Sequence, residues 1–213
     1  MSYALKEIFP TLQGEGFHTG RAAVFARFAG CNLWSGREAD RATAACRFCD
    51  TDFVGVDGQG GGRFKSPEEL AETLIQCWQE SAADRSGQPF VVFTGGEPML
   101  QLDTALIGAC HQRGLEVAIE TNGTLEVPAS VDWICVSPKP NSELVQRSGH
   151  ELKLVFPHEV RPEMVADLAF DHFFLQPMDG AQREQNTEAT IAYCRAHPQW
   201  RLSLQTHKML GIP

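Results

Sequence analysis

Short apolar runs recur along the chain, and each ends in a polar or glycine-containing cluster. Apolar residues at helical spacing separate several of these runs, and such alternation indicates parallel strands joined by right-handed crossovers. A complete eight-stranded barrel usually needs about 250 residues, whereas this chain has 213. We therefore expect an α/β fold, an incomplete, open (β/α) barrel of about six or seven mostly parallel strands with short helices. The predicted strands are Arg21–Ala29, Phe90–Phe93, Leu115–Ile119, Trp133–Val136, Glu151–Phe156, Phe173–Leu175 and Arg201–Leu204, with a weaker one at Tyr3–Phe9.

Local signals mark helices and one long loop. Ser66 is a helix cap and Glu69 completes its capping box, so a helix is predicted from this point to about Glu80. A single domain, residues 1–213, accounts for the whole pattern. The other expected elements are helices from about Met99 to Gln112 and from about Thr187 to Ala196, and a glycine-rich loop at Gly55–Lys65.

Bulk composition limits the classes of partner. The formal net charge is −9 and the basic residues form no stripe, so binding to a phosphate backbone is not expected. No apolar run approaches the ~20 residues of a membrane span, and the first residues lack the basic and apolar regions of a signal peptide. We expect a cytoplasmic protein that binds neither nucleic acid nor membrane. Its seven cysteines are then expected to be thiols rather than a disulfide framework.

Three of the cysteines are clustered as C-x14-C-x2-C, at Cys31, Cys46 and Cys49. Structural zinc normally needs four protein ligands, and the fourth would be His18 or a remote cysteine. An iron–sulfur cluster held by three cysteines would instead keep one iron open for a ligand. A loop without metal is the third alternative. The other cysteines, Cys77, Cys110, Cys135 and Cys194, lie singly in apolar patterns and are predicted to pack in the core.

Polar groups at strand ends are further candidates, because ligands of parallel α/β folds bind at the carboxyl edge of the sheet. Thr94-Gly95-Gly96-Glu97 follows a strand of the kind that is buried on both faces. Its glycines allow close backbone approach, and Glu97 can accept hydrogen bonds from an amine or a ribose. Arg27 is charged in an otherwise apolar strand, so it lies either at an edge or against a ligand. A cysteine triad together with this glycine-rich turn favours the iron–sulfur cluster.

The cysteine pattern resembles that of the radical S-adenosylmethionine superfamily, whose usual spacing is C-x3-C-x2-C. This chain keeps Cys46-Arg47-Phe48-Cys49 but has 14 residues between Cys31 and Cys46. Residues 32–45 would then be an insert inside the cluster-binding loop of a single radical S-adenosylmethionine domain. From Lys6 to Pro213 the chain resembles the 7-carboxy-7-deazaguanine synthase family, in the motifs LQGEG (12–16), FCDTDF (48–53), TGGEP, ETNG, VSPK, QPMD and QTHK.

The resemblance implies a lyase that cleaves S-adenosylmethionine reductively at a 4Fe–4S cluster. The resulting radical takes a hydrogen from 6-carboxy-5,6,7,8-tetrahydropterin, whose ring contracts and loses ammonia to give 7-carboxy-7-deazaguanine on the path to queuosine. Mg²⁺, an electron donor such as a flavodoxin, and a homodimer are also implied. No side chain is assigned a catalytic role, because the cofactors supply the electron and the radical while the fold orients and shields them.

Matching motifs carry the family's sites onto this chain residue by residue. Cys31, Cys46 and Cys49 would hold the cluster, and Thr51 would bind Mg²⁺, which favours hard oxygen ligands. The implied S-adenosylmethionine site consists of Phe48, Asp50, Gly96, Ser137, Pro138, Lys139, Gln176, Pro177, Met178 and Asp179. The implied pterin site consists of Leu12, Gln13, Gly14, Arg27, Thr94 and Pro213.

Three further residues are weighed against plain structural roles. The 2-amino edge of a pterin donates hydrogen bonds that a carboxylate can accept. Either Glu15 or Glu120 would supply this carboxylate, and the alternative for each is a solvated acid in a loop. The carboxylate of the pterin would pair with a cation, and Arg27 can bind a carboxylate through two nitrogens. His207 is either a donor to the pterin ring or a structural histidine at a strand end.

Two other functions remain open. An activase that places a glycyl radical on a partner protein would share the radical chemistry, although such enzymes generally keep the standard cysteine spacing. A zinc-stapled binding module would need only a fourth ligand beside the three cysteines.

Overall fold

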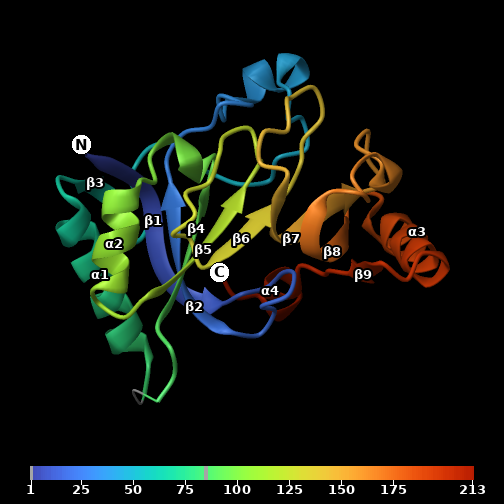
Figure 1. Cartoon of the computed structure of the whole chain (residues 1–213). Helices are drawn as coiled ribbons and strands as arrows, with labels where there is room; N and C mark the ends of the chain where they lie inside the picture. Colours follow the sequence, from blue (N-terminus) through green and yellow to red (C-terminus); the bar gives the residue numbers. More distant parts are fainter. Residues whose placement is uncertain (1, 84–85) are drawn as a thin grey trace.

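The computed structural model describes residues 2–83 and 86–213. Within these residues the strands form one nine-stranded sheet in the order β3-β1-β2-β4-β5-β6-β7-β8-β9 (Figure 1). The run from β2 through β4 to β9 is parallel throughout, whereas β1 is antiparallel to both β2 and β3. The strands are β1 (Tyr3–Leu12), β2 (Ala22–Phe28), β3 (Gly62–Phe64), β4 (Phe90–Gly95), β5 (Glu116–Thr121), β6 (Trp133–Val136), β7 (Ser148–Phe156), β8 (Ala169–Pro177) and β9 (Trp200–Leu202).

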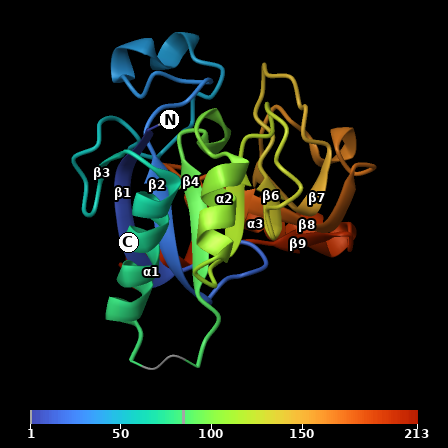
Figure 2. The ribbon, with the colours of Figure 1, turned by 60° about the vertical axis from the view of Figure 1, so that its left-hand side comes forward.

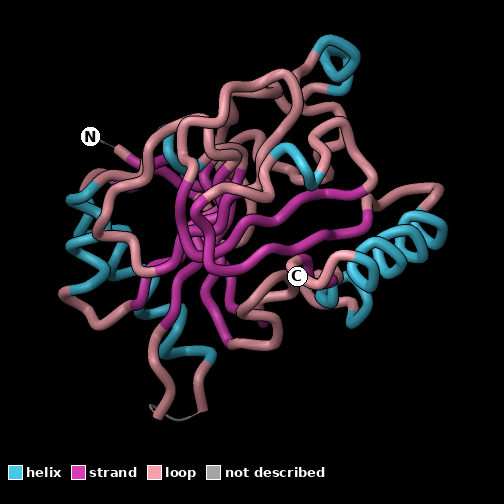
Figure 3. Tube along the Cα trace, turned by 45° about the vertical axis from the view of Figure 1, so that its right-hand side comes forward, coloured by secondary structure: helices cyan, strands magenta, loops and turns pink. Residues whose placement is uncertain are grey.

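The sheet twists and curls into an open barrel (Figure 3). β3 and β9 are its edges, and no ladder joins them in the part of the chain that the structure describes. The predicted incomplete, open barrel is therefore confirmed. The expected strand number corresponds to the seven parallel strands of the described chain, and the two antiparallel strands, β1 and β3, come in addition.

Two local predictions are wrong. Gly55–Lys65, predicted as a loop, contains β3, which pairs with the start of β1. The helix expected from Met99 is split into a short 3-10 helix, η2 (Pro98–Leu100), and α2 (Thr104–His111). Asp103 causes the break, because its side chain accepts a backbone hydrogen bond from the first turn of α2 and caps a new helix.

Helices flank the sheet on its outer side. Ser66 caps α1 as predicted, since its side chain accepts a hydrogen bond from Glu69 N. α1 packs on β1 and β2, and α2 packs on β5 (Figure 2), while α3 packs on β8 and β9. None of the helices among the described residues could span a lipid bilayer. The remaining helices are α1 (Pro67–Ser81), α3 (Arg183–Ala196), α4 (Thr206–Leu210), η1 (Glu38–Thr43) and η3 (Pro162–Met164).

The main hydrophobic core fills the space between the outer face of the sheet and these helices. Val24, Ala26 and Phe28 of β2 are fully buried there. Phe25 and Arg27, which have the opposite parity, line a cavity on the inner face. The alternation predicted for this strand is thus confirmed, and it separates core residues from ligand-facing residues.

The inner face of the sheet changes from apolar to polar along the direction of the parallel strands. Toward the amino ends, Phe90 and Val92 of β4 pack with small residues of β2 and β5 in an apolar layer. Toward the carboxyl ends the inner residues become polar, and Glu120, Lys153 and Gln176 line a cavity there. The inner face therefore offers ligands polar partners at the carboxyl edge, where parallel α/β folds usually bind them.

Candidate active site

A cavity of about 340 Å³ lies at the carboxyl edge of the parallel strands. Cys46 and Cys49 lie in its wall, and η1 lies above this edge (Figure 1). Pro138 is the one predicted cofactor residue that faces elsewhere, since it lines a separate groove with Pro140. The wall contains the other predicted S-adenosylmethionine residues, which are Phe48, Asp50, Gly96, Ser137, Lys139, Gln176, Pro177, Met178 and Asp179.

A second cavity of about 260 Å³ adjoins the first. All residues predicted for the pterin line it, namely Leu12, Gln13, Gly14, Glu15, Arg27, Thr94, Glu120, His207 and Pro213. Thr51, the predicted Mg²⁺ ligand, lines both cavities and so lies at their boundary. The shared wall consists of Glu15, Asp50, Thr51, Thr94, Glu120 and Gln205.

The three clustered cysteines come together in space. Cys31 follows β2, and its sulfur accepts a hydrogen bond from Leu33 N at 3.4 Å. Burial raises the pKa of the Cys31 thiol, and the nearby Cys49 adds to the effect. Cys46 and Cys49 are in side-chain contact, which lowers the pKa of Cys49 to about 6 and raises that of Cys46. The fold therefore closes the long gap between the first cysteine and the other two.

The insert at residues 32–45 is attached to the cysteine loop by Arg41. One terminal nitrogen of Arg41, Nη1, donates to the backbone oxygens of Arg47 at 2.9 Å and Cys49 at 3.0 Å. The guanidinium also lies over the Trp34 ring, 4.1 Å from its centroid. The insert thus supports the segment that carries the C-x2-C pair.

Glu97 is used inside the fold. It is fully buried, and its Oε1 accepts from Thr121 Oγ1 at 2.7 Å and from Met99 N at 3.0 Å. Its Oε2 accepts from Asn122 N at 2.8 Å, and burial raises the pKa of this carboxyl. The interpretation of Glu97 as an acceptor for an amine or ribose is therefore wrong. The side chain joins the end of β4 to the end of β5 and fixes two parts of the cavity wall.

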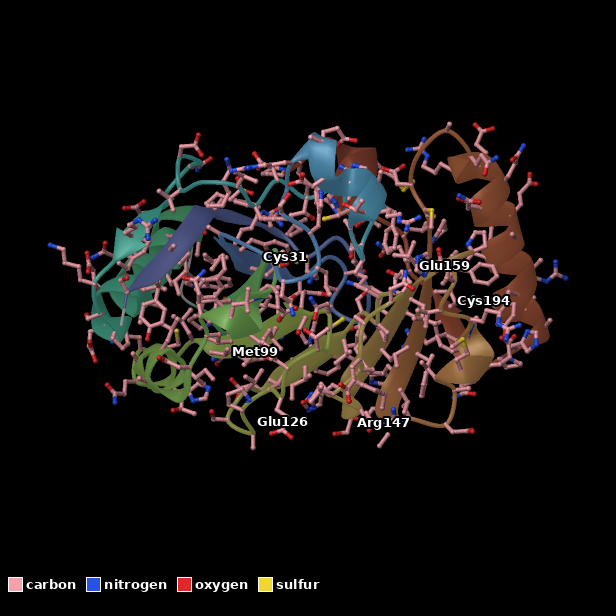
Figure 4. The ribbon with its side chains drawn as sticks, turned by 90° about the horizontal axis from the view of Figure 1, so that it is seen from above. Cys31, Met99, Glu126, Arg147, Glu159 and Cys194 are labelled. Atoms are coloured by element: carbon pink, nitrogen blue, oxygen red, sulfur yellow. The ribbon has the colours of Figure 1, made fainter. Side chains whose placement is uncertain are left out.

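Replacing Glu97 by alanine is expected to destabilise the fold. Three buried donors lose their acceptor, which lowers the free energy of unfolding by about 3 kcal/mol or more. Urea denaturation measures this loss, with Glu126→Ala as the control because Glu126 is exposed at the periphery (Figure 4). Equal denaturation midpoints for the two variants would contradict the structural role.

Arg27 faces the second cavity, as expected for an arginine that binds a ligand. Its Nε donates to Glu7 Oε1 at 2.7 Å, and the two residues are partners in the β1–β2 ladder. Its two terminal nitrogens donate no hydrogen bond to any of the described residues. The ion pair therefore orients the guanidinium and leaves two nitrogens for a carboxylate.

The carboxyl-terminal QTHK motif contributes more than the predicted His207. Lys208 Nζ donates to Asp50 Oδ2 and, at 2.7 Å, to Asp179 Oδ2. It thus connects two predicted cofactor residues from different loops. His207 packs so closely on Gly14 that a Cβ at residue 14 would lie 2.2 Å from the histidine Nδ1. This close approach explains the glycine at that position.

Lys153 of β7 is a cavity residue that the sequence analysis missed. It lines the first cavity, and its Nζ donates to Glu15 Oε2 at 2.7 Å and to Glu120 Oε2 at 2.9 Å. Both predicted acids are therefore partnered inside the protein rather than solvated loop acids. A charged residue in the apolar run ELKLVF could have identified Lys153 as a candidate, just as a charge in an apolar strand identified Arg27.

The structure places two further predicted residues. Cys135 is buried as expected, and it lies on the inner face beside Glu120. His18, the proposed fourth ligand of a zinc site, packs on the rings of Phe90 and Trp133. These rings begin β4 and β6, so His18 lies at the opposite edge from the cysteines. The other single cysteines belong to the core or pack against it as predicted, namely Cys77, Cys110 and Cys194.

Comparison with known proteins identifies the family. Residues 40–137 match the Radical SAM superfamily. The chain is 64% identical to the 7-carboxy-7-deazaguanine synthase of Bordetella pertussis and 59% identical to that of Burkholderia multivorans, with 100% of each chain covered in both comparisons. The chain belongs to the 7-carboxy-7-deazaguanine synthase family. Its fold matches the crystal structure of QueE from Escherichia coli with a TM-score of 0.72 and 29% identity, over 96% of this chain and 94% of that chain.

The residues present fit the cofactors of a radical S-adenosylmethionine enzyme of the 7-carboxy-7-deazaguanine synthase family, a 4Fe–4S cluster and S-adenosylmethionine. Cysteine thiolates are the usual ligands of iron–sulfur clusters, and the three cysteines meet beside the first cavity. No three His, Cys, Asp or Glu side chains of the described chain converge on a single metal ion. A cluster does not require this convergence, because each thiolate binds a separate iron. Phe48 lines the same cavity, and its ring centroid lies 4.5 Å from that of His158.

Proposed function

We propose that this protein converts 6-carboxy-5,6,7,8-tetrahydropterin to 7-carboxy-7-deazaguanine with loss of ammonia, in queuosine biosynthesis. One observation supports the proposal most strongly. The residues predicted for the cofactor and those predicted for the substrate line two adjoining cavities that share a wall. The relatives from Bordetella pertussis and Burkholderia multivorans, both named 7-carboxy-7-deazaguanine synthase, also support it.

The chain would bind and orient the reacting groups. When bound, the cluster and S-adenosylmethionine supply the electron and the radical. Cys31, Cys46 and Cys49 would hold the cluster, and the first cavity would hold S-adenosylmethionine beside it. In the second cavity, Arg27 would bind the carboxylate of the pterin with its two free nitrogens. Thr51 would offer a hydroxyl to Mg²⁺, which takes few protein ligands and keeps waters or substrate oxygens.

The shared wall explains how the two ligands would be brought together. A ligand in the second cavity would lie against a ligand in the first, because the same six residues line both cavities. Hydrogen transfer needs such close placement, and holding the partners in position removes much of its entropic cost. The polar residues of the wall would also replace water around the pterin.

The assembly belongs to the same proposal. We infer that residues 1–213 act as a single radical S-adenosylmethionine domain with an insert at 32–45, and the single sheet in the described residues supports this. A homodimer and an electron donor such as a flavodoxin are proposed from the family resemblance. A cytoplasmic location is proposed as well.

Anaerobic turnover tests the proposed function. The protein is reconstituted with iron and sulfide and incubated with S-adenosylmethionine, a reductant, Mg²⁺ and the carboxytetrahydropterin. We expect 5′-deoxyadenosine, ammonia and 7-carboxy-7-deazaguanine, detected by mass spectrometry, with slower turnover after chelation of Mg²⁺. A protein that binds zinc and no cluster would contradict the proposal. So would cleavage of S-adenosylmethionine that leaves the pterin unchanged and is stimulated by a partner protein.

A further inference from the structure

Lys153 is the most buried charged side chain of the cavity walls, at 6% side-chain exposure. A lone ammonium at such a site would be strongly disfavoured. Burial alone would lower the pKa of Lys153, but the adjacent Glu120 and Glu15 raise it well above its usual value. The lysine therefore carries a charge and is shared by two carboxylates, which it contacts through the same Nζ atom.

The two carboxylates are held differently. Glu15 Oε1 accepts from Gln176 Nε2 at 3.1 Å and from Gln205 Nε2 at 3.0 Å, in addition to the contact of Oε2 with Lys153. Burial opposes the charge of Glu15, but Lys153 and the Gln205 amide outweigh it and lower the pKa of Glu15 to about 2. Glu15 is therefore the more firmly anchored of the two acids, with three donors on its oxygens.

Glu120 keeps unused acceptor capacity. Its Oε1 has one contact in the described residues, from Gln13 Nε2 at 3.3 Å, and its Oε2 accepts from Lys153. A carboxylate has about four acceptor positions on its two oxygens. Glu120 also lines both cavities. The shared wall thus presents a carboxylate that still has room for donors from a ligand.

We propose that Lys153 is a positioning residue, which bridges Glu15 and Glu120 so that Glu120 faces the substrate cavity as a carboxylate able to accept from the amino edge of the pterin. This inference rests on the proposed function. Lys153 itself need not touch the pterin, because its effect passes through Glu120. The anchored Glu15 fixes the lysine, and the lysine in turn fixes Glu120.

Other charged and titratable groups face this trio from the neighbouring elements. They are Glu151 on β7, Cys135 on β6, Lys139 in the loop after β6 and His207 on α4. Burial raises the pKa of Glu151 to about 7. As an acid, Glu151 supplies no positive charge that could compensate either carboxylate. Lys139 donates to Ser137 Oγ rather than to the acids. Lys153 is therefore the cation that compensates Glu15 and Glu120.

Binding of an unreactive ligand tests the proposal. Pterin-6-carboxylate, an oxidised and fluorescent analogue of the proposed substrate, is titrated into reconstituted holoenzyme with S-adenosylmethionine, from about pH 6 to pH 9. Without the cation, one of two adjacent carboxylates takes up a proton near neutral pH. Lys153→Met is therefore expected to weaken binding about tenfold near neutral pH, the effect of one pKa unit. The loss is expected to shrink as the pH rises, because the proton then leaves.

The conservative variant and one further readout separate positioning from general stability. Lys153→Arg keeps the charge and is expected to bind the analogue within about threefold of wild type. Iron content is expected to stay at its wild-type value in both variants. Unchanged analogue binding in Lys153→Met would overturn the proposal. A loss that is equal at every pH and is not restored by arginine would also overturn it.

A second variant covers the case in which Lys153→Met does not fold. Glu15→Gln keeps the side-chain shape but removes the carboxylate that anchors Lys153, so the lysine holds Glu120 less firmly and binding of the analogue is expected to weaken. Unchanged analogue binding in this variant would overturn the role of Lys153. Failure of the wild-type holoenzyme to bind the analogue would overturn the proposed function, and this inference with it.

Discussion

Replacing Cys31 by alanine is expected to abolish turnover of the pterin and to lower the iron content of the reconstituted protein. Cys31 reaches the other two cysteines only through the fold, and its removal leaves the cluster with two protein ligands. Loss of groups around a metal site typically costs about 10- to 100-fold in affinity or activity, and we expect the upper end of this range or more. Iron analysis, visible absorbance and product formation measure the effect.

The matched control for this prediction is Cys194→Ala. Cys194 packs against the core on α3, well away from Cys31 (Figure 4). This variant is expected to retain both iron and turnover, with a modest loss of stability from the smaller side chain. If Cys31→Ala retained as much iron and activity as Cys194→Ala, the three-cysteine cluster site would be refuted.

Replacing Gly96 by alanine is expected to impair cluster assembly although it removes no ligand. A Cβ at residue 96 would lie 2.0 Å from Gly30 O and 2.8 Å from Cys31 Cβ. Either the turn after β4 or the backbone before Cys31 must then move. Overpacking of this kind costs about 1–3 kcal/mol, and a displaced site can lose about 100-fold in rate. Iron content and affinity for S-adenosylmethionine are both expected to fall.

Gly108→Ala is the control for this substitution. Gly108 lies inside α2, and an added Cβ there would meet nothing within 4 Å. Because glycine is a poor helix former, alanine is expected to stabilise the protein by up to about 1 kcal/mol, with unchanged iron content. Normal iron content and normal turnover in Gly96→Ala would show that the clash is relieved without moving Cys31.

Most of the predicted site residues belong to short continuous motifs. Asp50 and Thr51 adjoin the C-x2-C pair, and the QPMD motif begins in the last two residues of β8. Such residues reach the cavity as soon as the strands are parallel and in register, since carboxyl ends then share one edge. Pro138 faces away from the cavity within such a motif. A motif therefore locates a loop but does not decide which way each side chain points.

The sequence by itself determined the open α/β barrel, the cysteine triad and the family. Strand alternation and motif spacing are local patterns, so they can be recognised along the chain without knowledge of tertiary contacts. Only the tertiary structure decided the roles of side chains whose partners are distant in sequence. Lys153 and Glu15 are 138 positions apart, and Glu97 is satisfied by β5 rather than by a ligand. A buried charge takes its role from the groups that compensate it, and only the folded chain brings those groups together.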